Sequence, residues 1–417
     1  MSLKAPKGTI DILPKDSAKW QFVEKTLRDI CDSFQFKEIR IPVFEHTELY
    51  VRGVGETSDV VSKEMYTFND KGERSITLRP EGTAGVVRSF LEHGLYADSQ
   101  PTKLYYMISC YRYEKPQAGR LREFRQFGVE MFGAASPAAD AEVISLVKHI
   151  FDKLGIQNLT LNLNNIGCPS CRKAYNDKLK AFLTDRKNDL CETCQERLER
   201  NPMRVFDCKS EVCQSVLKDA PRIYDCVCPE CKAHFDEMTS YLDEMGIAYQ
   251  LDKSIVRGLD YYSRTVFEFV SNDIGAQGTV CGGGRYDYLV EELGGKPCPG
   301  IGFAMGIERL LMVLENAGIP LPDPKEPQLY IAALGKEADK KAAKLVHTLR
   351  CAGIRAEKDY MERSVKAQMK YANKIKAEYT LVLGDDEIAA NKAQLKQMET
   401  GESQEVCLDE LKEKFLS

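Results

Sequence analysis

The sequence predicts an α+β core that is interrupted by a cysteine-rich insertion and followed by a small α/β domain. Residues 1–164 mix an amphipathic helical pattern with alternating, strand-like patterns. Nine of the 15 cysteines lie between Cys168 and Cys231. Four prolines within 318–327 then separate the last 90 residues from the rest. At 417 residues, the chain is long enough for two or three domains.

The composition excludes several classes of protein. Hydrophobic residues make up 43% and charged residues 29% of the chain, which is ordinary for a globular protein and excludes a disordered, collagen-like or coiled-coil chain. The net charge of −5 means that any nucleic-acid-binding surface must be local. We find no apolar signal segment and no run of about 18 apolar residues, so we expect no membrane span and a cytoplasmic location.

The first part of the core, residues 1–164, begins with an expected amphipathic helix over 18–33. Two strands are expected over 103–113 and 124–133. The second strand alternates, so that Gln126, Gly128 and Glu130 share one polar face. A half-solvated strand would also explain this pattern, but the connecting loop favours a binding site for phosphate groups. Five cations stand against two acids there: Arg112, Lys115, Arg120, Arg122 and Arg125 against Glu114 and Glu123.

The insertion, residues 165–250, carries cysteine pairs with the spacing of metal ligands. In a reducing compartment such pairs favour metal over disulfides. The first four, 168-x2-171 and 191-x2-194, match a four-cysteine zinc pattern. A single zinc with spare thiols, and redox chemistry, remain alternatives. Eight cysteines suffice for two structural zinc ions, with Cys226 left over: Cys168, Cys171, Cys191, Cys194, Cys208, Cys213, Cys228 and Cys231.

The core resumes over 251–322 with strands, a glycine run and a helix, and the last domain is expected over 323–417. Its elements are a strand at 328–334, helices near 338–350 and 363–376, and a strand at 379–383. Residues 336–376 hold 12 Lys and Arg against 5 Asp and Glu, whereas 377–417 hold 4 against 10. Lys366, Lys370 and Lys374 follow one helix face, which is either an ordinary solvated face or, beside Arg363, an RNA contact.

Several stretches resemble the class II aminoacyl-tRNA synthetases. Residues 111–114 with 124–128 resemble motif 2 of that class, residues 302–310 resemble motif 3, and residues 39–42 resemble the weaker motif 1. Arg257-Gly-Leu-Asp-Tyr-Tyr262 and Gly282-Gly-Gly-Arg-Tyr-Asp287 resemble the two signatures of the histidyl-tRNA synthetase family. The resemblance covers nearly the whole chain. It implies a catalytic domain on an antiparallel sheet and a C-terminal α/β domain of the anticodon-binding type.

The resemblance also implies roles for single residues. Arg112 and Arg257 would be catalytic at the α-phosphate of ATP, Arg257 taking the place of a metal ion used elsewhere in the class, and Arg309 would hold the γ-phosphate. Gly282, Gly283 and Gly284 would let the backbone approach adenine. Histidine would be bound by six residues, the first two at its amino group: Glu81, Thr83, Gln126, Glu130, Tyr261 and Tyr262.

The implied reaction is ATP-dependent activation of histidine and its transfer to tRNA(His), with Mg²⁺ accompanying ATP, in a homodimer. tRNA contacts are expected at Arg120, Arg363 and the three lysines of the stripe. We also expect the insertion to lie on the tRNA acceptor arm. Its cations are Arg172, Lys173, Arg197, Arg200 and Arg204.

Two other functions compete with this one. A non-catalytic relative, the synthetase-like regulatory subunit of ATP phosphoribosyltransferase, would share the core and sense histidine. It typically lacks the C-terminal domain and the arginine signatures, which are present here as Arg112, Arg257 and Arg309. A zinc-dependent nucleic-acid-binding module without catalysis would not need those arginines.

Overall fold

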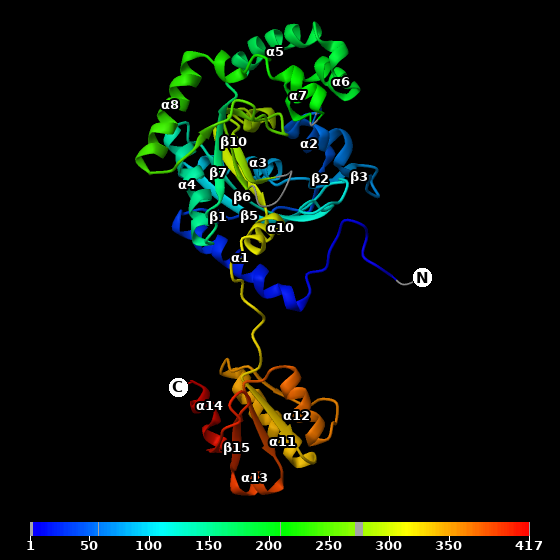
Figure 1. Ribbon diagram of the computed structural model, residues 1–417, viewed down its shortest axis with the longest axis vertical. Helices are drawn as coiled ribbons and strands as arrows, with labels where there is room; N and C mark the ends of the chain where they lie inside the picture. The colour runs from blue at the N-terminus through cyan, green and yellow to red at the C-terminus, as the bar shows by residue number, and fades with distance from the viewer. Residues whose placement is uncertain (1–2, 57, 209, 272–277, 417) are drawn as a thin grey trace. The chain divides into compact units, whose positions relative to one another are not determined.

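The computed structural model describes residues 3–56, 58–208, 210–271 and 278–416. The chain forms two compact units, Met1–Pro322 and Asp323–Ser417 (Figure 1). Among the helices of the described ranges, none combines the length and the apolar character needed to cross a bilayer.

An eight-stranded sheet organises the first unit. Its inner strands pair antiparallel, and only the outermost pairs, β1 with β5 and β7 with β8, are parallel. The expected antiparallel sheet is therefore confirmed. In spatial order the strands are β1 (Lys37–Glu38), β5 (Thr102–Tyr111), β6 (Glu123–Phe132), β11 (Gly300–Gly306), β10 (Thr279–Arg285), β9 (Ser263–Ser271), β7 (Leu159–Asn165) and β8 (Gln250–Leu251).

One face of this sheet is closed by helices α1 (Pro14–Ser33), α4 (Pro137–Lys153) and α10 (Ile307–Asn316). The apolar side of β6 packs into this core through Phe127, Val129 and Met131, as the alternation predicts. The polar side of β6 therefore faces the opposite side of the sheet.

That opposite side carries helices α2 (Thr47–Val54), α3 (Thr83–Glu92) and α9 (Leu289–Glu292), together with the five-residue π-helix η1 (Val60–Glu64). A three-stranded antiparallel sheet joins them, with β2 (Phe44–His46) and β3 (Tyr66–Asn69) on either side of β4 (Ser75–Leu78). The sequence did not predict this small sheet, since its strands are only three or four residues long.

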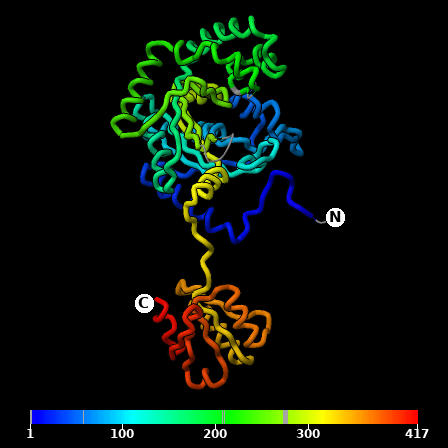
Figure 2. The backbone as a smooth tube through the Cα atoms, viewed as in Figure 1, coloured from blue at the N-terminus to red at the C-terminus, as the bar shows by residue number. Residues whose placement is uncertain are grey.

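The cysteine-rich insertion leaves the large sheet after β7 and returns at β8 (Figure 2, green). These strands pair in parallel, with Asn162 opposite Gln250, so both ends of the insertion are fixed at one sheet edge. The described residues between them form four helices and three short 3₁₀ turns. They are α5 (Pro169–Thr184), η3 (Lys187–Asp189), α6 (Glu192–Arg200), η4 (Pro202–Asp207), α7 (Glu211–Leu217), η5 (Ile223–Cys226) and α8 (Pro229–Glu244).

Three of these helices begin immediately after a cysteine: α5 after Cys168, α6 after Cys191 and α8 after Cys228. The second cysteine of each CxxC pair then falls in the first turn of the helix. Helix N-termini favour thiolates, so the pairs are placed where a metal ligand needs them.

The second unit has a five-stranded sheet in the order β13 (Ala356–Lys358), β12 (Leu329–Ala333), β14 (Tyr379–Leu383), β15 (Lys392–Gln397) and β16 (Ser403–Cys407). The first three strands are parallel and the last two antiparallel. Its helical elements are α11 (Lys336–Cys351), α12 (Val365–Lys374), α13 (Asp385–Ala390), η7 (Leu408–Glu410) and α14 (Leu411–Leu416). This is the expected small α/β fold with three strands added, β13, β15 and β16.

Candidate active site

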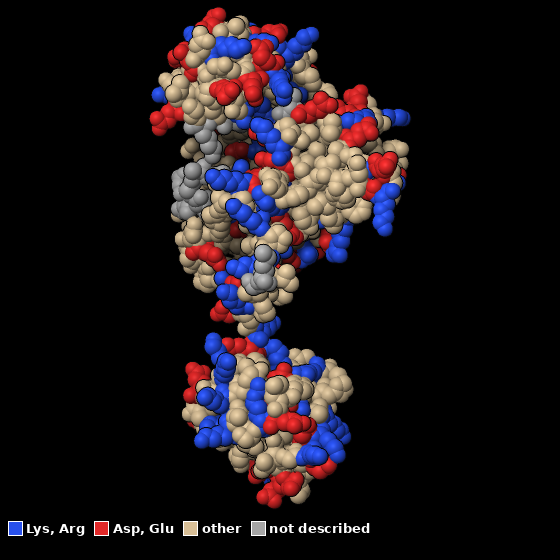
Figure 3. Space-filling model, turned by 90° about the vertical axis from the view of Figure 1, so that its right-hand side faces the viewer, with Lys and Arg blue, Asp and Glu red and all other residues tan. Residues whose placement is uncertain are grey.

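A cavity of about 570 Å³ opens on the polar face of the large sheet. In Figure 3 the first unit is hollowed beneath the insertion, with Lys and Arg crowding the hollow. The cavity is lined by residues from separate segments that the sequence had proposed as one site: Glu81, Thr83, Arg112, Gln126, Arg257, Tyr261, Tyr262, Gly282 and Arg309. Arg120, which was expected to contact tRNA, lines the same cavity.

Glu81 and Thr83 lie at the start of α3. The Glu81 carboxylate accepts the backbone N–H groups of Thr83 and Ala84 at 2.7 and 2.8 Å, so it caps the helix. Glu81 is 2% exposed, and burial raises the pKa of its carboxyl group. A carboxylate held by two backbone amides at the cavity wall is a preorganised acceptor for an ammonium group.

Gln126 and Glu130 share the polar face of β6, but only Gln126 lines the cavity. The Oε1 atom of Gln126 accepts the N–H of Gly82 at 3.0 Å. Glu130 lies beneath the cavity and is 1% exposed. The Thr83 hydroxyl donates to Glu130 at 2.7 Å, and Tyr286 donates to its other oxygen.

Glu130 therefore differs from its expected position. It is not among the residues that line the cavity, because hydroxyl groups of the protein surround its carboxyl group. Burial raises its pKa to about 8. In this structure Glu130 orients Thr83, and a direct contact with the imidazole of histidine stays a prediction.

Tyr261 and Tyr262 form an aromatic wall, with ring centroids 4.7 Å apart and the ring planes tilted by 43°. Both residues are buried, and burial raises the pKa of both phenols, which keeps them neutral donors. Tyr286 meets the Tyr261 ring edge-on at 5.7 Å. The wall offers aromatic rings that carry hydroxyl groups, which suits a heteroaromatic ring.

Three arginines reach the cavity, two from the connection between β5 and β6 and one from α10. Arg112 donates to the carbonyl of Pro80 at 2.8 Å, and Arg120 pairs with Glu114 at 2.8 Å. Arg309, in the first turn of α10, donates to the carbonyl of Thr279 at 2.6 Å. Burial, with Arg120 and Arg112 nearby, lowers the pKa of Arg309. Glu114 compensates part of this positive charge, and a bound anion would compensate more of it.

Arg257 forms the opposite wall, where it pairs with Glu268 and lies 5.4 Å from the Tyr262 ring centroid. Gly282 is explained by this arginine, because a Cβ there would approach the guanidinium to 2.5 Å. Gly283 and Gly284 instead pack inside the sheet against Phe303 and the carbonyl of Thr265. Neither lines the cavity, so an adenine contact for these two glycines stays a prediction.

Two profiles of known protein families match the chain over most of its length. The histidyl-tRNA synthetase family profile matches residues 8–310, and an anticodon-binding-domain profile matches 328–417. The chain belongs to the histidyl-tRNA synthetase family. A histidine–tRNA ligase of Acetivibrio thermocellus is 60% identical over 411 residues, 99% of each chain. The apo histidyl-tRNA synthetase of S. aureus has a TM-score of 0.86 at 44% identity, with both chains fully covered.

A second solved structure shares the histidyl-tRNA synthetase fold at lower similarity. It is described as an ATP phosphoribosyltransferase regulatory subunit/histidyl-tRNA synthetase from Bacillus halodurans, with a TM-score of 0.64 and 20% identity over 89% of this chain and 97% of its own. The family and class II fold expected from the motifs are therefore confirmed.

The site of this histidyl-tRNA synthetase family member also contains residues that sequence reasoning missed. Glu268 pairs with Arg257 and accepts the Thr279 hydroxyl at 2.9 Å. Glu308 accepts the backbone N–H of Arg125 at 2.9 and 3.0 Å. Glu308 directly precedes Arg309 in the motif 3-like stretch, so its place in the sequence could have indicated it. Glu268 gave no such signal, because it occurs in an ordinary alternating strand.

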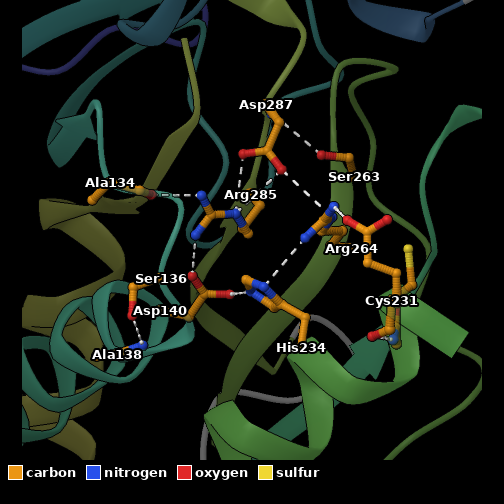
Figure 4. Close-up of polar contacts among 12 residues, drawn as sticks. Ala134, Ser136, Ala138, Asp140, Cys231, His234, Ser263, Arg264, Arg285 and Asp287 are labelled. Atoms are coloured by element: carbon orange, nitrogen blue, oxygen red, sulfur yellow. Dashed lines mark hydrogen bonds and ion pairs between the residues drawn. The ribbon is translucent and has the colours of Figure 1, made fainter.

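The second family signature also has a buried structural role. Arg285 pairs with Asp140 of α4 and with Asp287 (Figure 4). Asp140 in turn meets His234 of α8 at 2.9 Å, and His234 meets Arg264 at 3.3 Å. This network connects the strands below the cavity with the last helix of the insertion.

The eight predicted cysteines form two groups, each with its Sγ atoms within 4.8 Å of one another. Tetrahedral zinc–thiolate geometry needs sulfur atoms about 3.8 Å apart. The Cys168–Cys171 distance is 3.6 Å and the Cys191–Cys208 distance is 3.8 Å, so both groups fit zinc. The Cys194 backbone N–H lowers the pKa of Cys191 to about 7, which favours the thiolate.

The grouping differs from the one that the spacing suggested. Cys168 and Cys171 meet Cys228 and Cys231, whereas the inner pair 191/194 meets 208/213. The first four cysteines match a zinc pattern in sequence but do not form one group, because the fold brings the two ends of the insertion together at one sheet edge. Cys226 belongs to neither group, as predicted.

The cations proposed for RNA have different surroundings. On α12, Lys366, Lys370 and Lys374 are exposed along one face. Arg363 pairs with Asp359 at 2.6 Å and lies 4.5 Å from the ring centroid of Tyr371. In the insertion, Lys173 and Arg200 are exposed, but Arg172, Arg197 and Arg204 bond to the core.

Proposed function

We propose that this chain activates histidine with ATP to form histidyl-adenylate and transfers the histidyl group to tRNA(His). The observation that carries the proposal is the convergence of Arg112, Arg257 and Arg309 on one cavity whose wall also holds Glu81. The cations suit a triphosphate and the carboxylate suits an ammonium group. Identity of 54–60% to histidine–tRNA ligases over nearly the whole chain supports it.

In the first step, a carboxylate oxygen of histidine attacks the α-phosphorus of ATP. The bond from the α-phosphorus to the bridging oxygen breaks, and pyrophosphate leaves. Two anions must approach, so fixed cations lower the barrier without moving. We assign Arg112 and Arg257 to the reacting phosphate and carboxylate, and Arg309 to the γ-phosphate. Arg112 and Arg309 are already anchored through backbone carbonyls, which limits the reorganisation they need.

Histidine itself is bound by groups that match its polar atoms. Glu81 accepts from the α-ammonium with Thr83, while Gln126, Tyr261 and Tyr262 surround the imidazole. An imidazole offers one donor and one acceptor, and buried polar partners reject side chains that lack them. Glu130 supports this set through its bond with Thr83.

Mg²⁺ would accompany ATP and shield the charge of its phosphates. Its preferred oxygen ligands are present in the cavity lining as the carboxylates of Glu114, Glu268 and Glu308. Glu308 lies just after strand β11 and directly before Arg309, which we assign to the γ-phosphate. Of the three carboxylates it is therefore the best placed to face a triphosphate with bound Mg²⁺.

In the second step, a ribose hydroxyl at the tRNA 3′ end attacks the activated carbonyl, and AMP leaves. We assign Arg120, beside the cavity, to the 3′ end. We assign Arg363 with the lysine face of α12 to the rest of the tRNA. The three exposed lysines and the net charge of +7 over 336–376 support this, since phosphate contacts dominate RNA affinity.

We also propose two structural zinc ions, a homodimer and a cytoplasmic location. The two cysteine groups support zinc, and 15 free thiols fit a reducing compartment. Val43 and Phe44 follow the motif 1-like stretch and are 43% and 56% exposed, and Phe68 on the same small sheet is 48% exposed. Such apolar exposure fits a subunit interface, and sedimentation analysis of the purified chain should give the mass of a dimer.

Histidine-dependent exchange of pyrophosphate into ATP tests the catalytic function. We expect exchange that requires histidine and ceases when histidine is omitted. The regulatory-subunit alternative predicts histidine binding without exchange.

A further inference from the structure

The segment that carries Arg257 has no regular secondary structure between residues 252 and 262. Behind it lies a second cavity of about 210 Å³, lined by Arg172, Arg204 and Arg257, among others. Arg257 thus borders both cavities. Ile255, Tyr261 and Tyr262 pack into the core, but the middle of the segment, around Arg257 and Gly258, borders a polar cavity and depends on individual hydrogen bonds for its position.

Several of those hydrogen bonds come from the insertion. Arg204 is 6% exposed and donates to the carbonyl of Gly258 at 2.5 Å, one residue after Arg257. It also pairs with the Asp260 carboxylate at 3.3 Å, to which Asn201 donates at 3.2 Å. Arg172 donates to the Asp260 carbonyl at 3.0 Å.

These donors are adjacent to the two cysteine groups. Arg172 directly follows Cys171, a member of the outer group, which consists of Cys168, Cys171, Cys228 and Cys231. Arg204 lies in η4, between Cys194 and Cys208 of the inner group. Arg197 donates to the carbonyl of Arg204 at 3.1 Å and so ties α6 to the same turn. Each cysteine group therefore fixes one arginine that reaches the Arg257 segment.

We propose that Arg172 and Arg204 are positioning residues that hold the segment of Arg257 in its catalytic place, and that metal in the two cysteine groups is required for them to do so. The inference rests on the proposed function and deepens it. It gives the insertion a part in amino-acid activation, before any tRNA binds.

The two arginines act through backbone and carboxylate contacts rather than on substrate. Their loss should therefore lower kcat for pyrophosphate exchange and also raise the KM for histidine, because Tyr261 and Tyr262, which we assign to the imidazole, lie at the end of the same segment. We expect a loss of about 10- to 100-fold, the usual effect of displacing a catalytic group by about 1 Å.

The test compares Arg204→Ala, Arg204→Lys and Arg172→Ala with Arg186→Ala. Arg186 is an exposed insertion arginine that donates to the carbonyl of Phe182 within its own segment, so it serves as the matched control. Arg204→Lys should recover part of the rate. Wild-type exchange in the same assay establishes the proposed function separately.

Hydrogen exchange at amides 257–262 and zinc content supply readouts besides activity. Arg204→Ala and Arg172→Ala should keep their zinc, while these amides lose protection. Removal of zinc from the full chain by a chelator should deprotect the same amides. If both arginine variants keep the wild-type kcat and amide protection, the positioning role is wrong. If zinc-free protein keeps that protection, the metal link is wrong.

Discussion

Arg257 contacts a carboxylate and an aromatic ring, and a neighbouring glycine leaves space for its side chain. Glu268 and Tyr262 fix its guanidinium, and the absence of a Cβ at position 282 allows the approach. Glu268 already compensates its charge, so the guanidinium is held in place before any substrate binds. The arrangement is typical of a site built for a reacting phosphate.

Arg257→Ala should lower the rate of pyrophosphate exchange by about 10²- to 10³-fold, because a fixed cation is removed where charge develops. Its stability cost should be small, since Glu268 keeps its bond with Thr279. Exchange kinetics and thermal unfolding, followed at the single tryptophan Trp20, measure both effects. Turnover near the wild-type value would show that Arg257 is not catalytic.

The buried carboxyl group of Glu130 should make the stability of the protein depend on pH. Its pKa is raised from 4.5 to about 8 by burial. Between these values the folded protein holds a proton that the unfolded chain has released. The free energy of unfolding therefore contains the full contribution of this proton below about pH 4.5. It falls as the pH rises to about 8, by at most about 1.4 kcal/mol per pH unit.

Glu130→Gln removes this titration, so its thermal unfolding should depend less steeply on pH between 5 and 8 than that of the wild type. Trp20 fluorescence reports the unit that contains Glu130. Glu244→Gln, at an exposed position on α8, is the control and should retain the wild-type slope. Equal slopes in Glu130→Gln and wild type would contradict a protonated Glu130.

At the scale of elements, local patterns predicted α1, the β5–β6 pair and most of the second unit. Each has a clear period or a proline boundary. The β2–β4–β3 sheet and β15–β16 were missed, because short or charged strands carry weak patterns. The pairing of the cysteines was also missed. It depends on β7 and β8 lying side by side, which is a contact between residues about 90 apart in the chain.

The grouping of the first two cysteines with the last two, around the inner group, can be tested by mutation. A variant with serine at Cys168, Cys171, Cys228 and Cys231 should keep about one zinc per chain, because the inner group stays complete. The sequential grouping predicts that this variant disrupts both sites. Zinc analysis of the purified protein distinguishes them, and Cys226→Ser should keep the wild-type content.

At the scale of the whole molecule, an acidic chain binds RNA only if its positive charge is gathered locally. The second unit does this by separating its halves, with net charges of +7 over 336–376 and −6 over 377–417. The sequence predicted this polarity, since it needs only composition. It could not predict that three insertion arginines bond to the core, because that depends on tertiary contacts.

Replacing Lys366, Lys370 and Lys374 together by alanine should weaken tRNA charging without affecting pyrophosphate exchange. The logarithmic slope of the tRNA KM against salt should decrease by about 0.7–0.9 for each phosphate that the variant no longer neutralises. Lys392→Ala, at a lysine paired with Glu405 on the edge strands, is the control. An unchanged charging rate and salt slope would place the tRNA contact elsewhere.

Exchange of labelled pyrophosphate into ATP, with each amino acid offered in turn to the zinc-loaded full chain, tests the proposed function most directly. We predict exchange with histidine and background rates with the others, followed by charging of tRNA(His) with histidine. Folded, zinc-loaded protein that binds histidine but supports no exchange would contradict the assignment of Arg112, Arg257 and Arg309 to catalysis.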